Sequence, residues 1–291
     1  MRFAIALLIV AACGDEGPVA DPYQCVASGG EACFELPSYR IRAADPMGVL
    51  AEPALDCAPF SPSSLGDATF SGHTADYASI VGDVRVEVFS DVAMTDSLAA
   101  VQSDADGVFS ADIAAMPNQM FVRTTADGRL PTLRLYQRFD VAPTGYYATT
   151  LADADVTSML AGPGDRRLPG KSQLRGIVND CAGKRLINVV ANIAPSSGKN
   201  GWRLFEPGVR TYYQSDFDGS FLRRTVGSQT TPAGIFLATN LAPGHHFVQV
   251  WGFLTDEDLM LGSLGLKLLA EDEIVVPDAD SVVVTHEYAR L

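Results

Sequence analysis

The chain has 291 residues and a formal net charge of -14 at pH 7, because 35 aspartate and glutamate residues outnumber 21 lysine and arginine residues. Such a surface repels polyanions, and nucleic-acid binding normally depends on basic residues that neutralise phosphates. We therefore expect no nucleic-acid partner and no electrostatic attachment to an anionic membrane. The length and the hydrophobic content of 47% allow two domains of ordinary size.

The N-terminus has the pattern of a bacterial lipoprotein signal. Arg2 is followed by a short apolar run, and the quartet Val-Ala-Ala-Cys that ends at Cys13 resembles the lipobox of such signals. The run is too short for a transmembrane helix, which needs about 20 apolar residues. We predict that residues 1–12 are removed and that Cys13 is acylated, so that the lipid holds the protein in the bacterial cell envelope. Gly14 favours the outer membrane or the cell surface.

Residues 13–65 are predicted to form a lipidated tether with a small disulfide loop. Besides Cys13 the chain has an even number of cysteines, which in an exported protein favours disulfides. These are Cys25, Cys33, Cys57 and Cys181, for which three pairings are possible. Cys25 and Cys33 lie close together in a glycine-containing stretch, so a local bond is favoured, and Cys57 would then pair with Cys181. The cysteine and histidine spacings are not those of a metal site, and we expect none.

In chain order, the predicted elements are short strands and one helix. Alternating apolar and polar residues predict strands at Val84–Phe89, Met120–Thr125, Phe247–Trp251 and Ser281–Thr285. The helix is expected at Ala152–Leu160, before a glycine-rich stop. Turn residues between the runs favour β-sandwiches over alternating strands and helices. The predicted fold is all-β, with a first sandwich over 66–160, a linker over 161–171 and a second sandwich over 172–291.

The two halves share a pattern of glycine and phenylalanine. A glycine in an early strand permits close packing, a second glycine supplies a positive φ at a turn, and a phenylalanine two residues later faces the core. The residues concerned are Gly72, Gly107 and Phe109 in the first half, and Gly176, Gly234 and Phe236 in the second. This order resembles carboxypeptidase regulatory-like domains, the transthyretin-like (prealbumin-like) β-sandwiches common in bacterial surface proteins. The resemblance implies two tandem sandwiches with a structural, adhesive or partner-binding role.

The second half contains an insertion at about 194–230, which is too long for a hairpin loop. It is predicted to form an extra hairpin or a binding loop. Its aromatic residues Trp202, Tyr212 and Tyr213 form either a small additional core or, if exposed, a flat surface on which a sugar could stack. The second possibility gives an alternative function, that of a carbohydrate-binding module.

A remote alternative is a metal-dependent enzyme. The adjacent His245 and His246, together with Tyr212 and Tyr213, resemble the ligands of intradiol dioxygenases, whose iron is bound by two tyrosines and two histidines. Those enzymes place one residue between the histidines, so that both face the same side. Adjacent residues on a strand face opposite sides, and we therefore expect no iron site here.

Two Asp-x-Asp-Gly sequences, at 104–107 and 216–219, could place two carboxylates on a calcium ion. Neither follows the EF-hand spacing, and Asp-Gly hairpin turns explain both. We accordingly expect no catalytic residues and no cofactor. The expected partners are the membrane, through the lipid, and a polysaccharide, peptidoglycan or another envelope protein.

Overall fold

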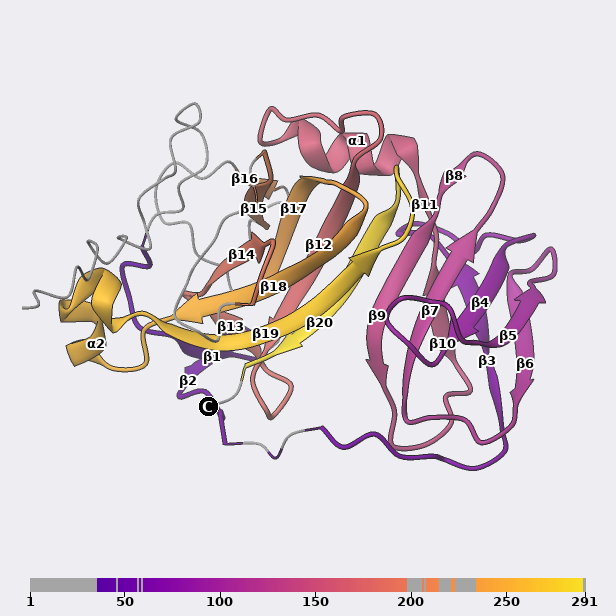
Figure 1. Cartoon of the computed structure of the whole chain (residues 1–291), viewed down its shortest axis with the longest axis horizontal. Coiled ribbons are helices and arrows are strands. Elements are labelled where there is room, and N and C mark those ends of the chain that lie inside the picture. The colour runs from indigo at the N-terminus through magenta and orange to yellow at the C-terminus, as the bar shows by residue number, and fades with distance from the viewer. Residues whose placement is uncertain are drawn as a thin grey trace, which may run out of the picture.

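The computed structural model describes residues 36–45, 47–56, 58, 60–197, 206, 208–214, 221–222 and 234–289. These residues form strands with a few short helices, so the predicted all-β class is confirmed. Figure 1 shows the strands in two groups that lie one after the other along the long axis of the molecule. None of the helices in the described ranges has the length and apolar content needed to cross a bilayer.

The first sandwich packs a sheet of order β10-β3-β6 against strands of order β5-β4-β7-β9. Their bounds are β3 (Ala68–Ala75), β4 (Arg85–Phe89), β5 (Ser97–Gln102), β6 (Val108–Ile113), β7 (Gln119–Thr125), β9 (Thr132–Arg138) and β10 (Tyr146–Thr149). Phe70, Val86, Phe109 and Met120 belong to the buried cluster of this sandwich. The short strands β8 (Arg129–Leu130) and β11 (Leu151–Ala152) pair with each other. Helix α1 (Asp153–Ala161) follows, within one residue of its predicted span.

The second sandwich packs strands of order β16-β15-β17-β12-β20 against a sheet of order β14-β18-β19. Their bounds are β12 (Ser172–Asn179), β14 (Val190–Ala194), β15 (Arg210–Gln214), β16 (Phe221–Leu222), β17 (Ile235–Leu241), β18 (Gly244–Gly252), β19 (Lys267–Val276) and β20 (Val282–Tyr288). Helix α2 (Asp256–Met260) and the 3-10 helix η1 (Gly262–Gly265) connect β18 to β19. Strands β15 and β16 belong to the predicted insertion and extend the sheet beyond β17. The described part of the insertion is therefore an extra hairpin.

Both sandwiches repeat one arrangement of strands. In the first, β3 pairs antiparallel with β6 and parallel with β10, and in the second β12 pairs in the same two senses with β17 and β20. Gly72 lies opposite Phe109, Gly176 lies opposite Phe236, and both rings are buried. The glycines before β6 and β17 have positive φ, Gly107 at 72° and Gly234 at 61°. The predicted glycine and phenylalanine pattern is confirmed.

Strand β20 joins the two sandwiches into one sheet. It pairs in parallel with β12 along one edge and with β9 of the first sandwich along the other. In the described residues this gives a 12-stranded sheet that runs through the molecule (Figure 1). Leu133 of β9 and Val283 of β20 belong to the same buried cluster as Leu174 of β12. The predicted linker gave no indication that the sandwiches share a sheet and part of a core.

The predicted tether over 13–65 is wrong over residues 36–45 and 47–56, because this part of it is built into the second sandwich. Strand β1 (Arg42–Ala44) pairs with β13 (Arg185–Ile187) and with β2 (Leu50–Ala51), and β13 pairs with β12. Ile41 and Ala43 are buried in the core of this sandwich, and burial of apolar side chains favours docking over a free tether. The first sandwich is therefore inserted between two parts of the chain that build the second.

Substitution of the strand glycines tests the close packing inside the sandwiches. A Cβ atom on Gly176 would lie 2.0 Å from the ring of Phe236, and one on Gly72 would lie 1.9 Å from the carbonyl oxygen of Tyr146. We expect Gly176→Ala and Gly72→Ala each to lower the free energy of unfolding by about 1–3 kcal/mol, as over-packing does. Gly145→Ala is the control, because a Cβ there meets nothing within 4 Å. Urea unfolding gives the comparison, and an unchanged midpoint for Gly176→Ala would contradict the packing.

The shared sheet predicts that both sandwiches unfold together. Substitution Ile113→Ala removes a buried side chain from the first sandwich's own cluster and should cost about 2–5 kcal/mol. Because β20 and the common cluster couple the two halves, we expect calorimetry to show one transition that shifts as a whole in this variant. A melt in two steps, of which Ile113→Ala moves only one, would show that the halves are independent.

Candidate functional site

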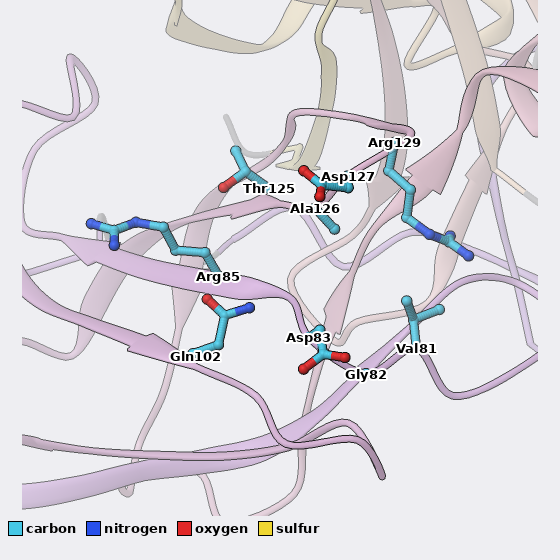
Figure 2. Close-up of a pocket in the computed structure, with 9 residues that line it drawn as sticks. All are labelled: Val81, Gly82, Asp83, Arg85, Gln102, Thr125, Ala126, Asp127 and Arg129. Carbon is cyan, nitrogen blue, oxygen red and sulfur yellow. The ribbon is translucent and has the colours of Figure 1, made fainter.

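A polar hollow of about 650 Å³ lies at one end of the first sandwich, where β4 begins and where β5 and β7 end. Its lining residues are Val81, Gly82, Asp83, Arg85, Gln102, Thr125, Ala126, Asp127 and Arg129. Figure 2 shows Arg85 and Arg129 on opposite sides of the hollow, with their guanidinium groups pointing away from each other. Arg129 is paired with Asp76 and Arg85 with Glu87, each at 3.1 Å. The lining therefore offers hydrogen-bond donors and acceptors, with both arginines already in ion pairs.

The first Asp-x-Asp-Gly sequence forms the hairpin turn expected for it. Asp104 Oδ1 accepts hydrogen bonds from the backbone N–H groups of Asp106 and Val108, at 3.0 and 2.8 Å. The N–H of Gly107 donates to the carbonyl oxygen of Asp104 at 3.0 Å. The Asp104 carboxylate thus accepts hydrogen bonds from backbone N–H groups of its own turn, as aspartate does in Asx turns. The second such sequence, at 216–219, lies outside the described residues.

Tyr212 and Tyr213 are buried, with 3% and 4% of their surfaces exposed, so neither ring offers the flat surface considered for a sugar. The Tyr212 hydroxyl donates to Asp165 Oδ2 at 2.7 Å, and burial together with this carboxylate raises the pKa of Tyr212 to about 12. The Tyr213 hydroxyl accepts the backbone N–H of Ala191 at 3.1 Å. Both rings are core residues because β15 continues the sheet of the second sandwich. Trp202 lies outside the described residues.

Asp165 connects the predicted linker to the second sandwich. Besides Tyr212 it accepts a hydrogen bond from Thr239 Oγ1 at 3.1 Å, and Arg210 lies 3.4 Å away. Only 6% of its side chain is exposed. The sequence gave no sign of this contact, because the residues involved lie far apart in the chain.

The two adjacent histidines face opposite sides of β18, as expected. His245 is exposed and contacts Glu273 at 2.9 Å, whereas His246 is buried. One ring nitrogen of His246 bonds to Glu206 and the other to the carbonyl oxygen of Ala242, at 2.7 Å for the latter. Both partners are acceptors, so the ring bonds both only as an imidazolium. Burial lowers the pKa of His246, but the bonds to Glu206 and Ala242 outweigh burial and raise it above its ordinary value.

This geometry does not assemble the iron ligands of an intradiol dioxygenase. Across the ranges that the structure describes, no three histidine, cysteine, aspartate or glutamate residues lie together as a metal site. His246 is committed to Glu206, and Tyr212 to Asp165.

Cys181 is the only cysteine among the described residues, and it is disulfide-bonded. Its backbone N–H donates to the carbonyl oxygen of Ala54 at 2.8 Å, and the N–H of Ala54 donates to Asp180 Oδ2 at 3.0 Å. The segment before position 57 therefore lies beside Cys181. The cysteines outside the described residues are Cys13, Cys25, Cys33 and Cys57, so lipidation and the pairing of the disulfides stay predictions.

Comparison with known proteins gives distant similarities only. No family model and no curated protein matches the chain. The Bacillus anthracis TIE protein is 8% identical with a TM-score of 0.23, and the match covers 77% of this chain and 34% of that protein. Shaft pilin SpaA of Lactobacillus rhamnosus GG is 7% identical with a TM-score of 0.21, over 77% of this chain and 97% of the pilin. The major pilin T-13 of Streptococcus pyogenes is 8% identical with a TM-score of 0.20, over 79% and 100%.

The chain thus spans about a third of the length of the TIE protein. Similarity at this level supports no argument about function.

The His246–Glu206 pair predicts a pH-dependent stability. Because the folded-state pKa of His246 is raised, this contribution is full below the unfolded-state pKa of about 6.5 and is lost as the pH rises through the folded-state value. Glu206→Gln should lower the free energy of unfolding by about 1.5–3 kcal/mol at pH 6, and by less at pH 9. His245→Gln, on the exposed side, is the control. Equal losses for Glu206→Gln at both pH values would show that His246 is not charged.

Proposed function

We propose that this protein is a lipid-anchored, non-catalytic protein of the bacterial cell envelope, made of transthyretin-like sandwiches that act as a structural or adhesive spacer. The observation that best supports the proposal is the sheet shared through β20. A spacer must keep its far end at a set position relative to its anchor, and two domains on a flexible linker do not. Here strand β1, one of the two layers of the second sandwich and one of the two layers of the first sandwich belong to a single hydrogen-bonded sheet.

The contacts across the junction support a single body. Besides the β9–β20 ladder, the hydroxyl of Tyr136 donates to the carbonyl oxygen of Glu273, and Arg123 forms an ion pair with Asp278 at 2.6 Å. Separation of the sandwiches would break these contacts and expose the buried cluster that contains Leu133. Such a junction resists bending better than a junction of loops alone.

The end of the molecule that contains α2 suits the side that faces the membrane. Figure 1 shows α2 at one end of the long axis and the first sandwich at the other. The described chain begins near α2, because the guanidinium of Arg40 lies 3.7 Å from the carboxylate of Asp256. Met260, Leu261 and Leu264 at this end are 79%, 60% and 76% exposed. Exposed apolar side chains favour contact with lipid near the proposed acyl group.

We infer that Cys181 pairs with Cys57, which leaves the other two cysteines predicted to form disulfides to pair with each other. The N–H of Cys181 donates to the carbonyl oxygen of Ala54, and the N–H of Ala54 donates to the Asp180 carboxylate. Because Cys57 follows Ala54 closely in the sequence, these bonds favour an approach of the two cysteines to the Cα separation of about 7 Å or less that a disulfide needs. This disulfide would fasten the segment that follows the acyl anchor to the second sandwich.

Acylation is tested by expression of the full chain in a Gram-negative host with an alkyne-labelled fatty acid. We expect label on the wild-type protein and its recovery with the membrane fraction, because two or more acyl chains give a stable anchor. Cys13→Ala should lose the label, whereas Cys25→Ala, a control at another cysteine of the N-terminal segment, should keep it. A wild-type protein that takes up no label would contradict the lipid anchor.

The structural or adhesive role is tested with the acylated protein in detergent. Co-sedimentation with purified peptidoglycan sacculi and with envelope polysaccharide should show saturable binding to one of them and no chemical change in the bound material. Release of soluble fragments from either material, measured by chromatography, would contradict a non-catalytic role.

A further inference from the structure

A row of basic side chains lies on one face of the shared sheet, at the junction of the two sandwiches. Arg134 of β9 and Arg175 of β12 are both in register with Val284 of β20, one on each side. Residues in register on neighbouring parallel strands face the same side of a sheet, so the two guanidinium groups flank β20 on one face. His286, two residues beyond Val284, faces the same side, in register with Ile177.

Two of these side chains lack the partners that basic side chains normally have. The guanidinium of Arg175 forms no hydrogen bond or ion pair with any residue that the structure describes, and neither does the ring of His286. Arg134 donates to the carbonyl oxygen of Tyr147 and to Thr149, but its buried Nε has no partner. Several other arginines of the described chain are in ion pairs, at Arg40, Arg42, Arg85, Arg123, Arg129, Arg167 and Arg210. The guanidinium of Arg175 is therefore available to an anion, and Arg134 lies on the other side of β20 from it.

His286, which lies in this row, experiences the charges of nearby arginines. Burial lowers the pKa of His286 to about 4, and the positive charges of Arg134, Arg185 and Arg175 contribute to this shift. His286 is therefore neutral at pH 7 and presents no further charge. An anion bound beside it would oppose the effect of the arginines and raise its pKa.

Both arginines lie against tyrosine rings, of which the one beside Arg175 is exposed. The ring of Tyr77 lies 5.8 Å from the guanidinium carbon of Arg175, and Tyr77 is 54% exposed. The guanidinium carbon of Arg134 lies 5.2 Å from the ring of Tyr146, which is buried. Exposed aromatic faces bind the apolar faces of sugar rings, and a planar guanidinium binds a carboxylate through two hydrogen bonds. The ring of Tyr77, unlike the buried tyrosines of β15, is open to solvent.

We propose that Arg134 and Arg175, with the exposed ring of Tyr77 beside Arg175, bind the carboxylate-bearing sugars of an acidic polysaccharide. The proposal rests on the proposed envelope function and specifies its ligand. A phosphate group also carries negative charge but has no face to stack on tyrosine, so the ring of Tyr77 favours a uronate over a phosphate. Arg175 is the residue to test first, because its side chain makes no hydrogen bond within the described chain whose loss would disturb the fold.

The test measures binding of an oligogalacturonate to the acylated full chain in detergent, by calorimetry at low salt. We expect Arg175→Gln to weaken binding about tenfold or more, as loss of a charged, bidentate contact does. Tyr77→Ala should also weaken it, by about threefold or more, through loss of stacking. Arg85→Gln, which removes the same charge from the hollow of Figure 2, should bind like the wild type. The signals of His286 should titrate at a higher pH in the complex.

Three results would overturn the proposal. Inorganic phosphate that binds as tightly as the oligogalacturonate, with no effect of Tyr77→Ala, would show an anion site without sugar recognition. A neutral oligoglucan that binds equally would exclude a role for the carboxylate. Absence of oligogalacturonate binding would refute the acidic-sugar site, and acylation with membrane recovery of the same sample would show that the envelope function itself had not failed.

Discussion

The structure depends on the pairing of β20 along both of its edges. Without it, β9 would be the edge of the first sandwich and β12 the edge of the second, each with unpaired backbone groups. One strand satisfies both edges, and its inward side chain Val283 fills the cluster that both sandwiches share. The edges of β9 and β12 are therefore covered by β20 and are not exposed to aggregation through pairing with another chain. Because β20 follows both β9 and β12 in the sequence, this junction forms only once all three strands are available.

The same strand also explains where the basic row lies. Side chains alternate along a strand, so burial of Val283 on one face leaves Val284 and His286 on the other. Because β20 pairs in parallel on both sides, Arg134 and Arg175 are both in register with Val284, one on each side of it. The arginines are far apart in the sequence, and neither sandwich alone contains both of them. The junction thus creates a surface that its separate parts do not have.

The sequence predicted what depends on local pattern. The alternating strands, helix α1 and the paired glycines and phenylalanines lie where expected, because each is set by residues a few positions apart. The shared sheet, the docking of Ile41 and the contacts of Asp165 connect segments far apart in the chain. No spacing of residues in the sequence predicts such contacts. The aromatic rings of β15 have the composition of a binding surface but not its exposure, which depends on the sheet around them. Local pattern thus indicates elements, whereas their long-range pairing determines which side chains are free.

A chain with a net charge of -14 can still bind an acidic polymer at one place, because charge acts locally in salt water. At physiological ionic strength, charges more than about 8 Å apart on a surface are largely screened. An anion at the row therefore experiences Arg134 and Arg175 more strongly than the distant carboxylates. The acidic remainder still repels the rest of a long polyanion, and this repulsion grows as salt is lowered. The two effects together favour binding of a few sugar units at the row over continuous binding along the molecule. Each such contact is weak and reversible, and an adhesive surface gains its strength from many contacts of this kind.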